Sequence, residues 1–250
     1  MSQLTLSIDM KGFIITFDNN RKKECIRDAY SLLNEHANKL YGEEMCTKMD
    51  IKNLNEPLDI EKEFDNEIHT LKETNKRERR FQNVKTKCKN CIFISIQLPE
   101  PYTLINDIFD DIRQNQNIKS RYIQRIIPVE ITCKAYLKDI AIAVEHYIPT
   151  YFPEELKPNN AFLINIKIRN NNSLNRDDII REITKLIHRQ NPNYKADLEN
   201  PDISILVEVL CTTCGLSFVD NFFKFKRFNM LQYSNFINQT LKKTTTVDDS

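Results

Sequence analysis

Two CxxC pairs carry residue types that could bind a metal ion: Cys88 with Cys91, and Cys211 with Cys214. Four thiolates in such pairs can hold a tetrahedral zinc ion. The segment between the pairs, residues 92–210, is much longer than the interval in common zinc sites, and both pairs lie beside predicted strands. Neither pair clearly opens a helix that would lower a thiol pKa. We therefore expect free thiols and predict no metal site.

Cys133 is the other candidate for a reactive side chain, because we predict it in the first turn of a helix, next to Lys134. Both features favour a thiolate. The same position also suits a small apolar residue packed at a helix start, and we favour that interpretation. The histidines form no HxH, HExxH or HxE motif, and the sequence has no GxSxG motif. Metal-dependent and serine hydrolases are therefore not expected.

Glycine is scarce, with only Gly12, Gly42 and Gly215 in 250 residues. Nucleotide-binding loops usually bring the backbone close to phosphate through clustered glycines. This sequence contains no GxGxxG motif and no P-loop. The scarcity also disfavours a loop that binds a coenzyme pyrophosphate, as an acetyltransferase needs. We expect no cofactor and no catalytic residues.

Basic and amide side chains are concentrated after a predicted strand at residues 162–169. Strand alternation places its isoleucines on one face and its basic residues on the other. A helix is predicted to begin just beyond, and helix N-termini are natural phosphate sites. Amide side chains can also bond ribose and base edges. The alternative is a polar loop with ordinary surface charges. We predict RNA-binding residues Lys167, Arg169, Asn170, Asn171, Asn172, Asn175 and Arg176.

Three further basic residues join the predicted RNA site: Arg121, Arg125 and Lys134. The two arginines are four residues apart on a predicted strand and so share a face, which also carries Ile123. Lys134 is predicted at the start of the following helix. Basic residues also alternate with phenylalanines at 223–228, a pattern that suits stacking on unpaired bases. A segment that packs its phenylalanines on the core is the more common alternative.

The net charge of +1 excludes a generally basic protein, but the charge is unevenly distributed. Residues 43–67 hold nine acidic and three basic residues, whereas residues 72–89 hold eight basic and two acidic residues. A local basic stretch can bind RNA in a nearly neutral protein, although both runs could also be solvated linker. No apolar run approaches the roughly 20 residues of a membrane span. We expect no membrane association, no secretory signal and a reducing compartment.

The predicted elements alternate between strands and helices and end in two successive strands, which indicates an α+β (α/β) fold. Residues 43–88 read as a long charged insertion, and the end of the chain from residue 238 as a frayed tail. We predict helices that begin near Asn20, Pro101, Thr132 and Asn175. We predict strands at residues 12–17, 92–98, 122–129, 162–168, 203–210 and 216–219.

Several segments together resemble a THUMP domain, and more closely the THUMP domain-containing protein 1 family. The resemblance spans nearly the whole chain except residues 43–78 and the tail. It implies a ferredoxin-like N-terminal domain at 1–100, with the insertion at 43–88, a THUMP domain at 101–225 and a tail at 226–250. The segments that carry it are ECIRDAYSLLNEHANKLYG at 24–42, RRFQ at 79–82, RYIQRIIPV at 121–129, TCKA at 132–135 and KIRNNN at 167–172.

This resemblance implies an RNA-binding adaptor rather than an enzyme. Such a protein binds tRNA, of the serine and leucine types, and supports N4-acetylcytidine formation in the D-arm by a separate tRNA cytidine acetyltransferase. The family also implies residence in the nucleus or nucleolus. THUMP-containing methyltransferases carry an Asn-Pro-Pro-aromatic motif, but here Asp202 follows Asn200 and Pro201.

Two alternatives stay open from the residues alone. One is a small tRNA-modifying enzyme that uses Cys133 or a zinc ion held by the CxxC pairs. The other is a scaffold that binds only proteins, through the acidic insertion.

Overall fold

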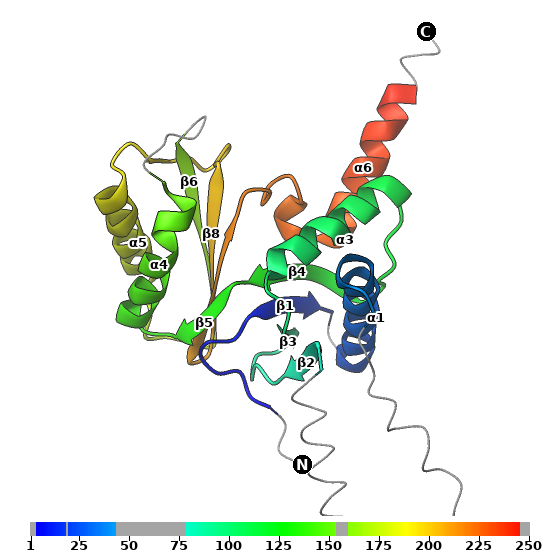
Figure 1. Cartoon of the computed structure of the whole chain (residues 1–250), viewed down its shortest axis with the longest axis horizontal. Coiled ribbons are helices and arrows are strands. Elements are labelled where there is room, and N and C mark those ends of the chain that lie inside the picture. Colours follow the sequence, from blue (N-terminus) through cyan, green and yellow to red (C-terminus); the bar gives the residue numbers. More distant parts are fainter. Residues whose placement is uncertain (1–3, 19, 44–78, 154–159, 246–250) are drawn as a thin grey trace, which may run out of the picture.

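The structure, a computed structural model, describes residues 4–18, 20–43, 79–153 and 160–245. It contains two β-sheets, each with helices on one face, so the predicted mixed class, α+β, is confirmed. In Figure 1, α4 and α5 lie on one side of the second sheet and the first sheet lies on the other side. The part of the predicted insertion at 44–78 lies outside the described residues.

The first sheet is antiparallel, with the strand order β2-β3-β1-β4. Its two helices bury apolar residues three or four positions apart, which gives each helix one apolar face. The element order β-α-β-β-α-β is the one a ferredoxin-like domain requires, and that assignment stays a prediction. The elements are β1 (Gly12–Phe17), α1 (Lys22–Tyr41), β2 (Phe81–Val84), β3 (Cys91–Ile96), α3 (Pro101–Asn115) and β4 (Ile123–Val129).

The second sheet is mixed, with the strand order β5-β9-β8-β6-β7. β6 runs parallel to β8, and β9 runs antiparallel to both β8 and β5. β8 is buried on both faces, because α4 and α5 cover one face and the first sheet packs on the other. The elements are β5 (Ile131–Lys134), α4 (Leu137–Tyr151), β6 (Ala161–Arg169), α5 (Arg176–Gln190), β7 (Lys195–Ala196), β8 (Ile203–Leu210) and β9 (Thr213–Val219).

The two sheets meet at Gly215, in the middle of β9. A Cβ at this position would lie 3.2 Å from Val129 Cγ1 and 3.3 Å from Ile14 Cδ1. Such distances are tighter than ordinary van der Waals contact, so a methyl group here would require the side chains of Val129 and Ile14 to shift by a few tenths of an ångström. The missing side chain therefore allows the first sheet to pack directly on the second.

Residues 131–134 form a strand, so the prediction that Thr132 caps a helix is wrong. Thr132 pairs with Gly215 as β5 joins the edge of the second sheet. Its hydroxyl donates to the Ser7 carbonyl at 2.7 Å and accepts from the Met10 N–H at 2.8 Å. These contacts with the N-terminal segment use the hydroxyl that a helix cap would need.

The predicted second domain, residues 101–225, begins at α3, but the structure packs α3 and β4 with the first sheet. This sheet and its helices α1 and α3 form the first half of the molecule. β4 pairs with β1 from Gly12 opposite Val129 to Phe17 opposite Ile123. The chain therefore passes from the first sheet to the second between the end of β4 at Val129 and the start of β5 at Ile131.

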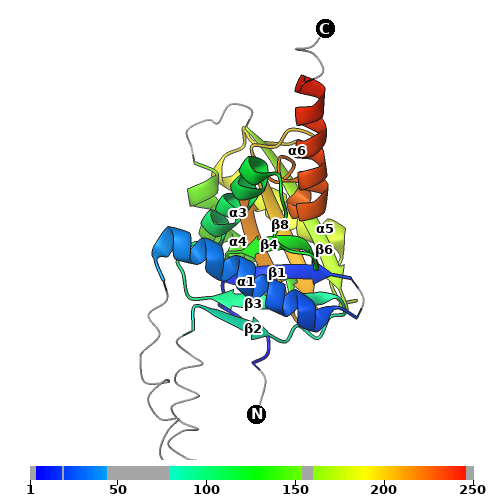
Figure 2. The same cartoon turned by 90° about the vertical axis from the view of Figure 1, so that its right-hand side faces the viewer.

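The C-terminal segment packs as a turn and a helix, η1 (Lys226–Phe228) and α6 (Met230–Thr245). Phe225 stacks on Phe109 with ring centroids 4.6 Å apart, and Phe228 meets the same ring edge-on at 5.9 Å. The prediction of a frayed tail is thus wrong for residues 238–245, which continue α6. Figure 2 shows α6 extending away from the body of the molecule. The predicted alternative, phenylalanines packed on the core, is the one observed.

Candidate nucleic-acid interface

The predicted basic residues of β6 lie on the face of the second sheet that looks toward the first sheet. The strand registers align Arg169 with Leu210, Thr213 and Lys134 in one row across four strands. Since neighbouring strands are about 4.8 Å apart, the backbones of Arg169 and Lys134 are separated by about 14 Å. The sheet therefore brings together two basic positions that are far apart in the sequence.

Lys167 lies in the next row on the same face, opposite Glu208. Its side chain is exposed, whereas the neighbouring Ile166 is buried against the helices. The alternation predicted for this strand is therefore confirmed. Lys134 is also exposed, but it ends strand β5 rather than beginning a helix.

Arg169 forms an ion pair with Glu208, and the two side chains are 23% and 10% exposed. Burial raises the pKa of Glu208, while the nearby charges of Arg169, Lys167 and Arg125 act in the opposite direction. Burial alone would lower the pKa of Arg169, but attraction to Glu208 outweighs it and the pKa is raised. Arg169 is thus committed to a partly buried pair inside the protein, and less of its charge is available to an external phosphate.

The structure adds a basic loop that the predicted site did not include. Lys85, Lys87 and Lys89 lie on the connection between β2 and β3, and all three are exposed. Asn170 Nδ2 donates to the Lys87 carbonyl at 3.4 Å, which places this loop beside the end of β6. The basic run at 72–89 was the sequence signal for it, but the run does not reveal which distant segment it touches.

The asparagines after β6 have different roles. Asn171 Nδ2 donates to the Cys211 carbonyl at 2.7 Å, and its Oδ1 accepts from the N–H groups of Ser173 and Leu174. Asn171 therefore builds the loop and joins it to the β8–β9 turn. Asn170 has a positive φ of 54°, and both it and Asn172 are exposed. These two amides remain on the surface of the candidate interface.

The start of α5 is less favourable to phosphate than we predict. The Asn175 side chain caps the helix by accepting from the Asp177 N–H at 2.9 Å. Asp177 and Asp178 then place two carboxylates in the first turn, where they oppose a second anion. Arg176 is exposed beside them. These acidic residues were readable in the sequence.

Arg125 and Arg121 occupy different environments. Arg125 is half-buried in β4, opposite Thr16, and is close enough to act on the pKa of Glu208. It therefore belongs to the same group of charges as Arg169. Arg121 is exposed in the loop before β4, where its backbone N–H donates to Asp28 at 3.0 Å.

The CxxC pairs do not converge as a zinc site would require. Cys88 and Cys211 meet with sulfur atoms 3.6 Å apart, but Cys91 is buried in the core of the first half. Cys214 lies on the face of the second sheet that α4 and α5 cover. Its hydrogen bond with Cys133, together with burial, raises the pKa of Cys214. Among the residues the structure describes, no group of three or more His, Cys, Asp and Glu side chains could hold a metal ion.

Cys133 lies in strand β5, paired with Cys214, and not in the first turn of a helix. The prediction of its position is therefore wrong. A thiol in the middle of a strand gains no stabilisation of its thiolate from a helix N-terminus. The geometry that favoured a reactive Cys133 is absent. All six described cysteines are free thiols: Cys25, Cys88, Cys91, Cys133, Cys211 and Cys214.

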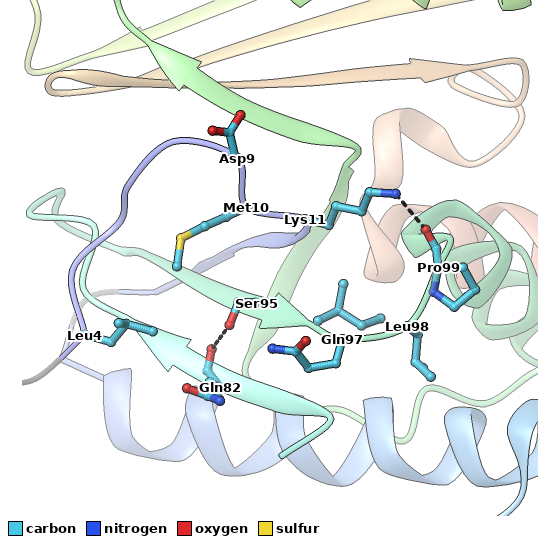
Figure 3. Close-up of a pocket in the computed structure, with 10 residues that line it drawn as sticks. Leu4, Asp9, Met10, Lys11, Gln82, Ser95, Gln97, Leu98 and Pro99 are labelled. Atoms are coloured by element: carbon cyan, nitrogen blue, oxygen red, sulfur yellow. Dashed lines mark hydrogen bonds between the residues drawn. The ribbon is translucent and has the colours of Figure 1, made fainter. Parts of the chain in front are cut away.

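A pocket of about 600 Å³ lies between the N-terminal segment and the strands β2 and β3 (Figure 3). Lys11 extends toward Pro99, and its Nζ donates to the Pro99 carbonyl at 3.1 Å. The Ser95 hydroxyl donates to the Gln82 carbonyl at 3.3 Å. These polar groups bond within the chain, and Lys11 is the one basic residue in the lining. A polyanion is better matched by the basic residues at one end of the second sheet.

None of the helices in the described ranges combines the length and the apolar content that a membrane crossing needs.

The sequence matches a described domain family and several named proteins. Residues 134–219 match the THUMP domain family. The chain is 34% identical to THUMP domain-containing protein 1 from Bos taurus over 88% of this chain and 62% of the relative. It is 32% identical to a THUMP domain-containing protein 1 homolog from Drosophila melanogaster, over 92% of this chain and 76% of the relative.

A more distant relative is named tRNA acetyltransferase TAN1, from Saccharomyces cerevisiae. It is 25% identical over 88% of this chain and 83% of the relative. The chain spans less than two thirds of the length of the mammalian relatives that it matches.

Proposed function

Because the chain belongs to the THUMP domain-containing protein 1 family, we propose that it binds tRNA and supports its modification. More specifically, it is an adaptor that presents tRNA of the serine and leucine types to a separate cytidine acetyltransferase. The modification is N4-acetylcytidine in the D-arm, and the site of action is the nucleus. The name of the Saccharomyces cerevisiae relative, tRNA acetyltransferase TAN1, supports acetylation as the reaction.

One observation carries the proposal: exposed basic side chains from three separate segments lie at one end of the second sheet, where β5, β6 and β8 finish. β5 contributes Lys134, β6 contributes Lys167, and the β2–β3 loop contributes Lys87. Asn170 links the last two segments through its contact with the Lys87 carbonyl. Such a surface suits the phosphate backbone of a structured RNA, which proteins recognise largely by shape and phosphate contacts.

Catalysis is assigned to the partner because the sequence provides few means to bind an acetyl donor. Only three glycines occur in the chain, so it has no glycine cluster for a coenzyme pyrophosphate. The adaptor supplies binding and orientation, which hold the target cytidine where the partner enzyme can reach it.

The binding step is tested by measuring the tRNA affinity of the purified protein at several salt concentrations. If about six phosphates are neutralised, the logarithm of the affinity falls against the logarithm of the salt concentration with a slope of about −5. The variant Lys87→Ala with Lys167→Ala should bind more weakly. Lys185→Ala, an exposed lysine of α5, serves as the matched control. Equal affinities of the two variants would refute this placement of the interface.

The adaptor role needs a separate test. Cells that lack the protein should lose N4-acetylcytidine from serine and leucine tRNAs, as measured by mass spectrometry of purified tRNA. The purified protein, incubated with an acetyl donor, ATP and tRNA, should produce no acetylcytidine until the partner enzyme is added. Acetylation by the purified protein alone would overturn the adaptor proposal and leave the binding proposal intact.

A further inference from the structure

Two cysteines from distant segments meet at the edge of the proposed tRNA interface. Cys88 lies in the β2–β3 loop and Cys211 in the β8–β9 turn, 123 positions apart in the chain. Their sulfur atoms are 3.6 Å apart. Each belongs to a CxxC pair, and only these two members of the pairs face each other. The contact joins the basic loop of the first half to the second sheet.

Short hydrogen-bonded turns hold both sulfur atoms in place. The Cys211 N–H donates to the Arg169 carbonyl at 2.9 Å, and the Cys211 carbonyl accepts from Asn171. The Cys88 N–H donates to the Thr86 hydroxyl at 3.2 Å, and that hydroxyl donates to the Cys91 carbonyl. The two thiols are therefore positioned by their own backbones.

Exposure separates this pair from the other close pair of thiols. Cys88 and Cys211 are both partly exposed, so a small oxidant can reach them. Cys214, which lies next to Cys133, is buried under the helices.

We propose that Cys88 and Cys211 form an oxidation site that a peroxide converts to a disulfide, which fastens the basic loop to the second sheet. In the first step a thiolate of Cys211 attacks hydrogen peroxide, which gives a sulfenic acid and releases hydroxide. In the second step the Cys88 thiol attacks that sulfur, the S–S bond forms, and the departing hydroxyl leaves as water. The sulfur atoms must approach from 3.6 Å to about 2.05 Å.

The order of the steps follows from the burial of Cys88. Burial, followed by the contact with Cys211, raises the pKa of Cys88 to about 11. The Cys88 thiol therefore keeps its proton, and Cys88 takes the resolving role. In a reducing compartment the disulfide is transient, because thiol systems reduce it again.

The effect on function rests on the proposed tRNA binding. The disulfide would form beside the hydrogen bond from Asn170 to the Lys87 carbonyl. It would therefore restrict the motion of the loop that carries Lys87 and Lys89. A loop fixed in one position loses less conformational freedom when RNA binds. The oxidised protein should therefore bind tRNA about threefold more tightly than the reduced protein.

The test treats the full chain with hydrogen peroxide, blocks remaining thiols with iodoacetamide and identifies disulfide-linked peptides by mass spectrometry. A peptide that joins Cys88 to Cys211, lost after dithiothreitol treatment, is the expected product. Cys88→Ser and Cys211→Ser should each abolish it, whereas Cys133→Ser should leave it unchanged. Sulfinic acid at Cys211 with no linked peptide, or links between two chains only, would overturn the oxidation site.

The tRNA affinity of the reduced and oxidised proteins is measured in the same experiment. A threefold gain that Cys88→Ser removes is expected. Equal affinities in the presence of the disulfide would overturn the regulatory role. If neither form binds tRNA, the proposed function fails while the linked peptide still reports on the oxidation site.

Discussion

Two basic regions of the molecule differ in what their charged side chains contact. At one end of the second sheet, Lys134 and Lys167 are exposed and make no ion pair with another described residue. In the C-terminal segment, Lys226 Nζ lies 3.6 Å from the centroid of Phe236, and Arg227 lies 5.6 Å from that of Phe223.

The C-terminal region is organised around its aromatic residues. The phenylalanines that alternate with these cations are not free to stack on bases, because Phe225 and Phe228 are buried against Phe109. Alternating basic and aromatic residues can therefore serve the core of the protein. A cation that already contacts an aromatic ring of the same chain is less available to bind a ligand.

The largest effect should come from removing an aromatic ring of the C-terminal region. Phe228 is fully buried, so Phe228→Ala should lower the free energy of unfolding by about 3–5 kcal/mol, as seen for buried aromatic residues. Urea unfolding measures the loss. tRNA affinity of the folded fraction should stay the same. The milder Phe228→Leu should lose less stability. If this variant is folded and still binds tRNA more weakly, the C-terminal region also takes part in binding, contrary to the comparison.

Glu208 gives a pH-dependent test of the other region. Its pKa is raised in the folded protein, mainly because of burial, so the folded state holds the proton to higher pH than the unfolded state. The contribution of Glu208 to stability is therefore greatest at low pH. It falls as the pH rises from the pKa of Glu208 in the unfolded chain to its higher pKa in the folded protein. The fall is at most about 1.4 kcal/mol per pH unit.

Urea unfolding across that pH range, compared with Glu208→Gln, isolates the Glu208 contribution. The variant has no carboxyl group at this position and should show a shallower fall in stability. Equal pH dependence of the two proteins would show that Glu208 does not titrate as the structure indicates.

Charge removal at this end of the second sheet should affect binding and leave stability nearly unchanged. Lys134→Ala with Lys167→Ala should lower tRNA affinity about tenfold and reduce the magnitude of the salt slope by about 1–2, because in the proposed interface each lysine contacts one phosphate. Surface substitutions of this kind usually change stability by less than about 0.5 kcal/mol. The control variant carries Lys224→Ala with Arg227→Ala in the C-terminal region. An equal loss of tRNA affinity in this variant would contradict the assignment of binding to the second sheet.

The smallest effect concerns Lys226. Its contact with Phe236 is an exposed cation–π interaction, so Lys226→Ala should cost about 0.5–1 kcal/mol of stability. Thermal unfolding can detect such a change. The salt slope of tRNA binding should remain that of the unmodified protein, and a reduced slope would place Lys226 at the RNA.

Much of the fold followed from periodicity in the sequence. The strand at β6 and the helix α5 were predictable because apolar residues alternate in one and recur every three or four positions in the other. β5 was not, because its Thr132 also resembles a helix cap, and its partners lie in β9 and in the N-terminal segment. Short edge strands depend on such distant contacts.

The candidate site was predictable in part. The polar face of β6 that carries Lys167 was predicted from strand alternation. Lys134 was predicted at a helix start, and its place on the same face as Lys167 depends on the pairing of β5 with β9. The ion pair of Arg169 was hidden because Glu208 is 39 positions away and only the register of β6 and β8 brings them together. The contribution of Lys87 was hidden for the same reason, since Asn170 is 83 positions away.

Gly215 bears on the distance between the basic residues of the two halves that tRNA would contact. The two halves touch where β9 has no side chain, so a group the size of one methyl sets how closely they approach. Lys87 belongs to one half and Lys134 to the other, and the distance between them follows from that approach. A methyl group at this position would meet only the side chains of Val129 and Ile14, so Gly215→Ala tests whether this contact sets the distance between the two cations.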